Sequence, residues 1–312
     1  MRYVFGPVPS RRLGISLGVD IVPYKTCTLD CVYCECGRTV QKTGDRKRFV
    51  EPEEVKRELG EYLSRKPDLD YITFSGGGEP LLNSGIGEII EFLKAGYGAY
   101  RLALITNGTL LRHRAVRGEL HGIDLMIPSV DAVSEDVFAL INSPCAGVRA
   151  ADVIEGVRLF RRENSARVWV EVFIVPGVND TSGELELLKE ALLSINPHKV
   201  QLNTLDRPGT EPWVSPAPAE KLEEIRQRFS PLYTEIISPP EKRKIIKKED
   251  SEDIKEMILS VLSRRPSTFE DLHHIFNFDI IELEGYLREL EDSGRISAEE
   301  KPRGIFFRTV CP

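Results

Sequence analysis

The stretch Cys27-Thr-Leu-Asp-Cys31-Val-Tyr-Cys34 brings three thiols into eight residues and decides how the rest of the chain is interpreted. It follows an apolar, β-branched run at residues 15–22, so we predict that it is the loop leaving a first strand. Thiols this close together are typical of metal sites in reducing compartments. A four-iron cubane is usually held by four protein ligands, one on each iron. Three cysteines would therefore leave one iron open to chelate a substrate.

The competing interpretation of these thiols is a structural zinc site closed by Cys36 or by a distant histidine. Zinc sites usually pair two CxxC-type knuckles, and this sequence has no second knuckle. The spacing therefore favours an iron-sulfur cluster. Cys145 and Cys311 stand alone in the sequence, and we expect both to be free thiols.

Length and composition indicate an ordinary globular protein with one large domain and something smaller, because 312 residues with 41% hydrophobic and 29% charged content can bury a substantial core. The formal charge of -7 argues against a surface that coats nucleic acid in general. The amino terminus has no unbroken apolar segment, and no later run is long enough to span a membrane. We therefore expect a cytoplasmic protein without membrane contact.

Strand and helix patterns alternate through the first two thirds of the sequence. Short β-branched and apolar runs indicate buried strands at 15–22, 71–75, 102–106, 125–130, 168–175 and 200–205. Amphipathic helical patterns lie between or after them, near 52–63, 86–93, 110–119, 150–163, 183–194 and 218–229. This alternation predicts parallel strands with right-handed crossovers, and hence an α/β sheet or barrel.

The residues able to do chemistry gather in the segments that follow the strands. These segments read KTCTLDCVYCECGR, GGGEPL, NGT, DAVSED, PGVND and DRPGT. Loops at the carboxyl ends of parallel strands are where α/β barrels assemble their active sites. We therefore expect all of these segments to meet on one face of the sheet.

A change in composition at residues 238–250, which are Pro-rich and then charged, marks a linker. Helical patterns follow near 252–262, 268–276 and 279–292, and a hairpin pattern closes the chain. Three helices and a hairpin predict a small winged helix-turn-helix domain. The predicted domains are thus 1–237, a linker at 238–250, and 251–312, and we expect a chain cut near Asp250 to keep its metal site.

The cysteine loop resembles the signature loop of the radical S-adenosylmethionine (SAM) superfamily, in which an aromatic residue, here Tyr33, precedes the last cysteine. The resemblance runs from residue 1 to about 237. It implies a partial (β/α)6 barrel, a [4Fe-4S] cluster on Cys27, Cys31 and Cys34, and reductive cleavage of SAM to a 5'-deoxyadenosyl radical. It also implies a reductant partner such as a flavodoxin or ferredoxin.

The resemblance also implies roles for residues in the loops after the later strands. The segment Gly76-Gly77-Gly78-Glu79-Pro80 is similar to the GGEP motif that binds the amino group of SAM, and glycines let the backbone approach a ligand closely. Tyr33 is implied to lie near the adenine, or else is a packed tyrosine. The positions implied to line the SAM ribose and carboxylate are Asn107, Ser129 and Asp131, of which Asp131 is alternatively a helix cap.

Two further charged residues each leave two interpretations open. Glu171, inside a predicted strand, is either a buried charge with a partner or a ligand to SAM. Arg207, at the end of the sixth predicted strand, is either a ligand for an anionic substrate or a solvated loop residue.

The substrate is less well defined by the sequence. The segments PVPSRRLG and LNTLDRPG, with the predicted winged helix, resemble iron-sulfur oxidoreductases grouped beside tRNA wyosine synthases. Those synthases carry additional cysteines before the signature loop, and residues 1–26 contain none, so the resemblance does not extend to their tRNA product.

Three classes of function remain open. An RNA-modifying enzyme is suggested by Arg11, Arg12 and the basic stretch at 38–48. An enzyme acting on a protein or small molecule is the second possibility. A DNA-binding regulator is disfavoured, because the recognition helix predicted at 279–292 has six acidic residues and one arginine.

Overall fold

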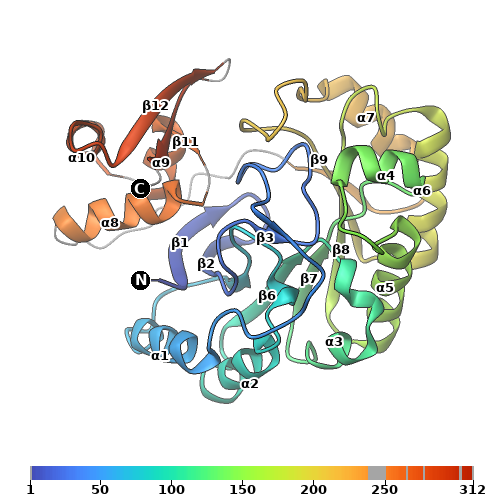
Figure 1. The fold of residues 1–312 in the computed structure, drawn as a ribbon, viewed down its shortest axis with the longest axis horizontal. Coiled ribbons are helices and arrows are strands. Elements are labelled where there is room, and N and C mark those ends of the chain that lie inside the picture. The colour runs from blue at the N-terminus through green and yellow to red at the C-terminus, as the bar shows by residue number, and fades with distance from the viewer. Residues whose placement is uncertain (1, 238–250, 265, 277, 302–303, 311–312) are drawn as a thin grey trace.

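The computed structural model describes residues 2–237, 251–264, 266–276, 278–301 and 304–310. Figure 1 shows a larger body of strands and helices with the C-terminal segment packed at one side of it. The predicted linker at 238–250 and Cys311 lie outside the described residues. The segment from Ser251 onward is called the tail below.

The larger body is built on an eight-stranded sheet in the order β1-β2-β5-β6-β7-β8-β9-β10. The strands from β2 to β10 run parallel, whereas β1 pairs antiparallel with β2. Their bounds are β1 (Val4–Ser10), β2 (Gly14–Val19), β5 (Tyr71–Phe74), β6 (Arg101–Thr106), β7 (Leu125–Pro128), β8 (Arg167–Phe173), β9 (Lys199–Asn203) and β10 (Thr234–Ile236). The predicted α/β fold with parallel strands is confirmed.

All six predicted strands are present, and the sheet has two more at its edges. The strand β1 contains Gly6 and two prolines, a composition that disfavours a strand but is tolerated at a sheet edge, where one side of the backbone needs no partner. The strand β10 is only three residues long and carries no periodic signal. Both additions extend the sheet without changing the order of the six predicted strands.

Helices follow most of the parallel strands, as the alternating pattern predicted. They are α1 (Pro52–Leu63), α2 (Ile86–Gly96), α3 (Arg114–Gly118), α4 (Glu135–Asn142), α5 (Ala150–Glu163), α6 (Ser182–Ile195) and α7 (Ala219–Arg228), with 3-10 turns η1 (Pro80–Leu82) and η2 (Thr109–Arg112). The first turn of α1 begins with Pro52, whose fixed φ suits that position.

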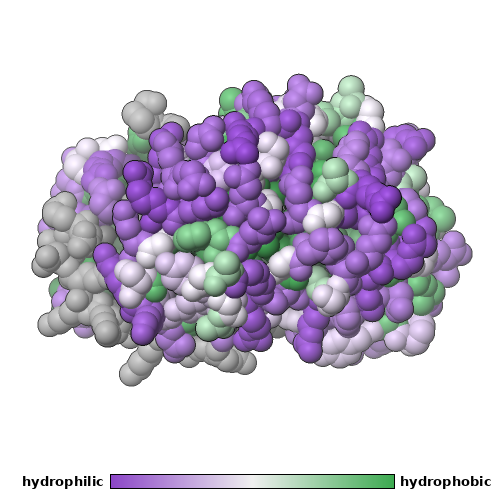
Figure 2. All heavy atoms as spheres, turned by 90° about the horizontal axis from the view of Figure 1, so that it is seen from below, coloured by the Kyte–Doolittle hydropathy of each residue, from purple (hydrophilic) through white to green (hydrophobic). Residues whose placement is uncertain are grey.

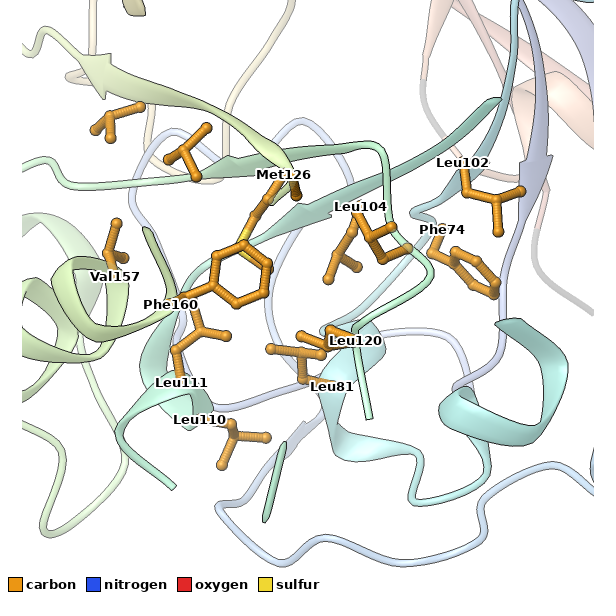
Figure 3. Packing of buried hydrophobic residues seen from close by; sticks show 14 of the residues in the cluster. Phe74, Leu81, Leu102, Leu104, Leu110, Leu111, Leu120, Met126, Val157 and Phe160 are labelled. Atoms are coloured by element: carbon orange, nitrogen blue, oxygen red, sulfur yellow. The ribbon is translucent and has the colours of Figure 1, made fainter. Parts of the chain in front are cut away.

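The main core lies between the sheet and these helices. Figure 3 shows Leu104 of β6 and Met126 of β7 directed toward Phe160 of α5, with Leu120 and Leu81 beside them. Successive residues of a strand point to opposite faces of the sheet. The neighbours of these core residues along each strand therefore lie on the other, inner face of the sheet. Among them, Ala103, Leu125 and Ile127 form a second, smaller apolar cluster with Leu13.

The inner face of the sheet is polar where it approaches the loops. Val170 and Val172 belong to the main core, so Glu171 between them faces the interior. Gln201 and Asn203 of β9 alternate in the same way with Val200 and Leu202. This polar inner face leads to the carboxyl ends of the strands, where the candidate site lies.

The tail has its own elements and its own core. It contains α8 (Ser251–Leu262), α9 (Phe269–Phe276), α10 (Ile280–Asp292) and a sheet of order β11-β13-β12, formed by β11 (Ser267–Thr268), β13 (Gly304–Thr309) and β12 (Ile296–Lys301). The three helices and the hairpin occur in the predicted order. A hydrophobic cluster separate from the main core joins α8, α9 and α10, and Val8 of β1 packs against it.

The outer surface is largely polar. Figure 2 shows one face of the molecule on which hydrophilic residues predominate and hydrophobic residues gather in small groups near the middle. None of the described helices combines the length and apolar character that crossing a lipid bilayer requires.

Candidate active site

The cysteine loop follows β2 and is tied into place by backbone hydrogen bonds. Cys27 lies in a short parallel ladder between β3 (Thr26–Cys27) and β4 (Gln41–Lys42). Farther along, the N–H of Val32 donates to Ile141 O and that of Asp30 to Asn142 O, at 2.9 and 3.0 Å. The loop is therefore anchored to α4, the helix that follows β7.

The glycine loop, residues 75–79, follows β5 and lies directly against the cysteine loop. The N–H of Lys25 donates to Gly77 O at 2.9 Å, and the N–H of Glu79 donates to Thr26 O at 3.0 Å. A Cβ on Gly78 would lie 2.2 Å from the carbonyl oxygen of Thr26. Because this oxygen belongs to the backbone, it cannot move aside as a flexible side chain could. Glycine is needed at this position so that the two loops can touch.

Asp20, in the segment after β2, supports the glycine loop from the other side. Its Oδ2 accepts a hydrogen bond from Gly77 N at 3.0 Å. A Cβ on Gly76 would lie 2.1 Å from the carboxyl carbon of Asp20, so this glycine too is required by a close approach. Burial raises the pKa of Asp20, and the hydrogen bond from Gly77 and the charge of Arg264 oppose that rise.

Glu79 joins the glycine loop to the segment that follows β6. Its buried carboxylate accepts from the Thr106 hydroxyl at 2.6 Å, from Asn107 N at 2.8 Å and from Leu81 N at 3.0 Å. Burial raises the pKa of Glu79, and these hydrogen bonds counter the rise. The carboxylate thus has a structural role, because it holds the glycine loop against the segment that follows β6.

Asn107 occupies the space between the glycine loop and the cysteine loop. Its Nδ2 donates to Thr28 Oγ1 at 2.8 Å and to Cys27 Sγ at 3.4 Å, and its Oδ1 accepts from Thr109. Four of the predicted site residues, Cys27, Gly77, Glu79 and Asn107, are thereby connected through a few hydrogen bonds.

Asp131, after β7, is the centre of a buried polar cluster. Its carboxylate accepts from the Tyr33 hydroxyl at 2.5 Å, from Asn142 Nδ2 at 2.8 Å and from Phe173 N at 2.9 Å. Burial raises the pKa of Asp131 to about 6, against the lowering effect of these bonds. The predicted alternative of a cap for α4 is wrong, because the carboxylate is directed at these three donors instead.

Tyr33 is packed as well as hydrogen-bonded. Its ring stacks on Phe173 with the ring centroids 3.8 Å apart and the planes 9° from parallel. Ser129, which precedes the Asp131 segment, forms an isolated bridge with Glu171 of β8. Tyr33, Ser129 and Asp131 therefore all lie close to β8.

Glu171 has a charged partner inside the barrel. Its carboxylate forms an ion pair with Arg12, and Asn203 Nδ2 donates to it at 3.2 Å. Of the two interpretations of Glu171, the buried charge with a partner is the one the structure supports. The sequence placed Arg12 near the site but gave no indication of this pairing.

Arg207 is buried, so the interpretation as a solvated loop residue is wrong, whereas its role as a ligand for an anionic substrate stays a prediction. The side chain is buried, and its guanidinium lies 3.2 Å from Glu35, 3.4 Å from Asp271 and 3.6 Å from Asp206. Glu35 stands between Cys34 and Cys36 in the cysteine loop, and Asp271 belongs to α9. Arg207 therefore joins the cysteine loop to the tail.

Cys36 lies closer to the site than its sequence position suggested. The N–H of Gly37 donates to Cys34 O, so the chain turns back sharply after the third cysteine. The Cys36 thiol faces Gly76 O at 3.9 Å, and the Tyr24 hydroxyl donates to Cys36 O at 2.7 Å. This turn brings Cys36 near Cys34 although it stands outside the three-cysteine motif.

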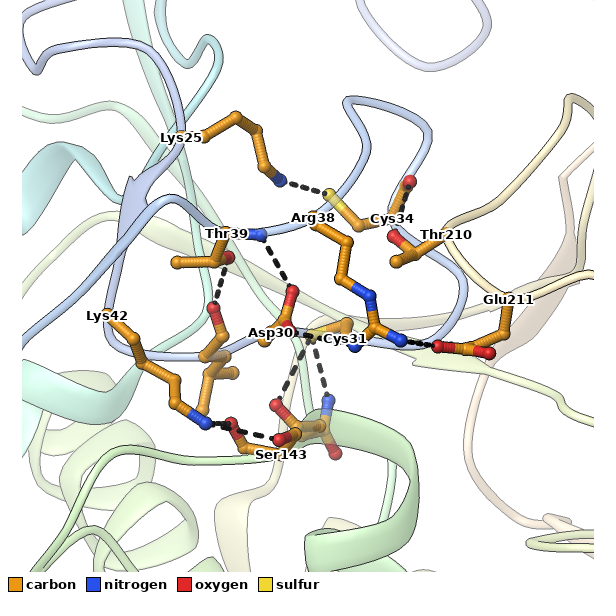
Figure 4. A network of polar contacts seen from close by, with 12 residues as sticks. Lys25, Asp30, Cys31, Cys34, Arg38, Thr39, Lys42, Ser143, Thr210 and Glu211 are labelled. Atoms are coloured by element: carbon orange, nitrogen blue, oxygen red, sulfur yellow. Dashed lines mark hydrogen bonds and ion pairs between the residues drawn. The ribbon is translucent and has the colours of Figure 1, made fainter.

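Each of the three predicted ligand sulfurs receives an N–H donor from a different segment. Asn107 donates to Cys27 and Asn142 to Cys31, both at 3.4 Å, and Lys25 donates to Cys34 at 3.2 Å. Figure 4 shows Lys25 directed at Cys34, and Cys31 in contact with the segment before Ser143. The sequence motifs did not identify Lys25 or Asn142, because their contacts depend on how the loop folds.

The pKa values of the three thiols are shifted in different directions by their surroundings. The hydrogen bond from Cys36 and the charge of Lys25 lower the pKa of Cys34 to about 6, against its burial. Burial and the charge of Glu79 raise the pKa of Cys27 to about 12, and burial raises that of Cys31. Metal binding displaces thiol protons, so a cluster would supply the compensation that the buried thiolates lack.

Among the residues that the structure describes, no three Cys, His, Asp or Glu side chains are grouped as ligands of one metal ion. The cysteine loop offers three sulfurs, each of which has an N–H donor.

A cleft of about 2640 Å³ opens beside the cysteine loop and extends to the tail. Its lining includes Lys25, Cys36 and Arg38 of the cysteine loop and Arg295 and Arg308 of the tail. Residues of the segment after β9, between Leu205 and Pro216, also line it. The candidate site thus has an opening large enough for more than a cofactor.

Comparison with known proteins gives a family match and full-length relatives. The family model described as the radical SAM superfamily matches residues 21–191. A UPF0026 protein of Methanocaldococcus jannaschii is 33% identical over 311 residues, which cover 95% of each chain. A Brachyspira hyodysenteriae protein named GTPase Obg is 33% identical over 307 residues, and the match covers 98% of this chain but 45% of that protein.

Among solved structures, a radical SAM methyltransferase from Sphaerobacter thermophilus has the same fold over much of the chain. The TM-score is 0.56 at 18% identity, and the superposition covers 71% of this chain and 66% of that one.

Proposed function

Because the chain belongs to the radical SAM superfamily, whose members use a [4Fe-4S] cluster and SAM, we propose that it cleaves SAM reductively. In this reaction the sulfonium accepts one electron from the cluster and its bond to C5' breaks, which yields methionine and a 5'-deoxyadenosyl radical. The radical then takes a hydrogen atom from the substrate. The observation that carries the proposal is the set of three sulfurs, each with its own N–H donor, beside a glycine loop.

The residues proposed to hold the cluster are Cys27, Cys31 and Cys34. The glycine loop, Gly76 to Glu79, is proposed to bind the amino group of SAM, since its position against the cysteine loop brings backbone close to the open iron. Asn107, Ser129 and Asp131 are proposed to line the SAM pocket. Tyr33 is proposed to lie beside the adenine. For Asp131 this role is indirect, because its carboxylate holds Tyr33 and Asn142.

The substrate is proposed to enter through the cleft that ends at the cysteine loop. The arginines that suggested RNA are already paired with carboxylates: Arg11 with Asp206, Arg12 with Glu171, Arg38 with Asp30 and Glu211, Arg46 with Glu119, and Arg48 with Glu88. The cleft is lined by acidic and basic groups alike. A polyanion gains little from such a surface, so we favour a protein or small-molecule substrate over RNA.

The test of SAM cleavage is anaerobic reconstitution of the full chain with iron and sulfide. We expect about four irons per chain and formation of 5'-deoxyadenosine from SAM once a reductant such as dithionite, flavodoxin or ferredoxin is supplied. Replacing any one of Cys27, Cys31 and Cys34 with Ala should abolish the cluster. Stoichiometric zinc with no deoxyadenosine would show that the proposal is wrong.

The substrate class is tested by mass spectrometry of cells with and without this chain. Small peptides and metabolites that differ between the two would support the favoured class. A modified nucleoside that disappears with the chain would instead establish an RNA substrate.

A further inference from the structure

The three side chains that donate N–H groups to the cysteine sulfurs differ in charge. Asn107 and Asn142 are neutral amides, whereas Lys25 donates to Cys34 through an ammonium group. A positive charge so close to a ligand sulfur stabilises added negative charge on the group that the sulfur binds. Hydrogen bonds and net charge around the sulfurs are among the factors that set the reduction potential of an iron-sulfur cluster.

The ammonium of Lys25 is held in place at some cost to the fold. The residue is 3% exposed, and a buried ammonium is unfavourable unless it is paired. Its backbone is left-handed, with φ of 58°, a conformation that residues with a Cβ seldom adopt. Both features persist only where the surrounding structure enforces them.

The surrounding structure does so through three backbone hydrogen bonds. Lys25 N donates to Gly77 O, and Lys25 O accepts from Val40 N and Gln41 N, at 2.9 to 3.0 Å. The left-handed turn therefore links the glycine loop to both arms of the cysteine loop. It also directs the side chain inward, as Figure 4 shows, where Nζ faces the sulfur of Cys34.

The groups that pair with this ammonium are thiols rather than carboxylates. Lys25 Nζ lies 3.2 Å from Cys34 Sγ. Within the described part of the chain, no carboxylate forms an ion pair with Lys25 Nζ. An ordinary buried lysine is neutralised by Asp or Glu, so this one is placed to interact with the sulfurs.

We infer that Lys25 sets the reduction potential of the cluster by stabilising its reduced form. The inference rests on the proposed function. Reduction adds one electron to a cluster already made negative by three thiolates, and a fixed positive charge at Cys34 favours the more negative state. Asn107 and Asn142 support the other two sulfurs as neutral donors. The electron comes from the same reductant that the proposed reaction requires.

The test compares Lys25→Met with the wild-type chain, both reconstituted anaerobically with iron and sulfide. Methionine removes the charge, is unbranched and only one atom shorter, and keeps the Cβ, so the backbone strain is the same in both proteins. The readouts are iron content and the EPR signal of the reduced cluster during a redox titration with dithionite and mediators. At a fixed solution potential near the wild-type midpoint potential, we expect the ratio of reduced to oxidised cluster in the variant to fall about tenfold. This corresponds to a midpoint potential lower by about 59 mV for a one-electron couple.

Two further variants serve as controls. Lys42→Met removes a lysine of the same loop whose Nζ contacts Ser143 instead of a sulfur, and it should leave the midpoint unchanged. Lys25→Arg retains the charge and should restore most of the wild-type potential.

The outcomes separate this inference from the proposed function. A wild-type chain that takes up no cluster contradicts the proposed function itself. A wild-type chain with a normal cluster and a Lys25→Met variant with full iron and an unchanged midpoint overturns only the inference. Loss of iron from both Lys25→Met and Lys25→Gln also overturns it, because the lysine would then serve cluster assembly.

Discussion

Cys36 is the residue at which the spacing of the cysteines and their arrangement in space disagree. Spacing separates it from the three-cysteine motif, whereas the turn at Gly37 brings its thiol to Gly76 O and to the sulfur of Cys34. A thiol in this position is either a fourth ligand or a donor that supports Cys34. A fourth ligand would fill the iron that SAM needs, so the second role agrees with the proposed chemistry.

We expect Cys36→Ala to keep about four irons per chain and to form deoxyadenosine, since three thiolates suffice for the cluster. The measurement is iron content together with deoxyadenosine yield, and Cys34→Ala, which removes a proposed ligand, is the matched control. Loss of iron in Cys36→Ala would mean a four-cysteine site with no open iron.

Individual residues differ in how far the sequence could predict them. The three cysteines and the glycine loop are recognisable because neighbours in sequence carry the whole pattern. Asp131 was predicted as a SAM contact or a cap, but its carboxylate holds Tyr33, Asn142 and a strand N–H, partners that lie far apart in sequence. Lys25 escaped prediction for a similar reason, because its role depends on a left-handed turn that no local signal marks.

At the scale of elements, the contact between the glycine loop and the cysteine loop is the feature on which the site depends. It is made by backbone atoms, and Gly78 has room for nothing larger than hydrogen. The elements on either side, β2 and β5, are neighbouring parallel strands, so the two loops leave the sheet side by side.

We expect Gly78→Ala to weaken SAM binding at least tenfold, about 1.4 kcal/mol. The added methyl group would lie 2.2 Å from Thr26 O and would force the two loops apart, while the sheet below them stays folded. Binding is measured by isothermal titration of the reconstituted protein. Gly96→Ala, where an added Cβ meets no atom within 4 Å, is the control, and equal affinities in the two variants would contradict the role given to Gly78.

The elements themselves were largely predictable, because buried parallel strands and amphipathic helices produce strong periodic patterns. The edge strands were not. In β1 the register shifts between Phe5 and Val8, next to Gly6 and Pro7, so no regular alternation exists to be detected. Val4 of this strand belongs to the main core and Val8 packs against the tail, and neither contact is visible in a local pattern.

At the scale of the whole molecule, two ion pairs between described residues join the tail to the site. Arg264, just after α8, lies 3.7 Å from Asp20, which holds Gly77 of the glycine loop. Its guanidinium also stacks over the ring of Phe5 at 4.2 Å. Asp271 of α9 pairs with Arg207, which holds Glu35 of the cysteine loop. The two loops of the proposed site each have a partner in the tail.

A chain cut near Asp250 should still bind the cluster, because every proposed ligand precedes the cut and the two cores are separate. Uncoupled SAM cleavage should persist and turnover of the true substrate should fall. Iron content and deoxyadenosine formation by the cut chain are the measurements. A cut chain that is insoluble or free of iron would show that the proposed domain division is wrong.

The point variant Arg264→Gln examines one of these contacts without removing the tail. Asp20 would keep its hydrogen bond from Gly77 but lose a charged partner in a half-buried setting, so we expect the Kd for SAM to rise about threefold to tenfold, with iron content unchanged. Arg295→Gln is the control, because Arg295 pairs with Glu256 inside the tail. Equal SAM affinity in both variants would show that Arg264 does not affect SAM binding through the glycine loop.

The pairing of Asp20 with Arg264 also restricts how this protein can be recombined. A chimera that joins this barrel to the tail of a relative without a basic residue at this position would leave Asp20 without its cation. The same holds for Arg207 and Asp271 across the other contact. An exchange of tails between relatives would therefore have to transfer both members of each pair together.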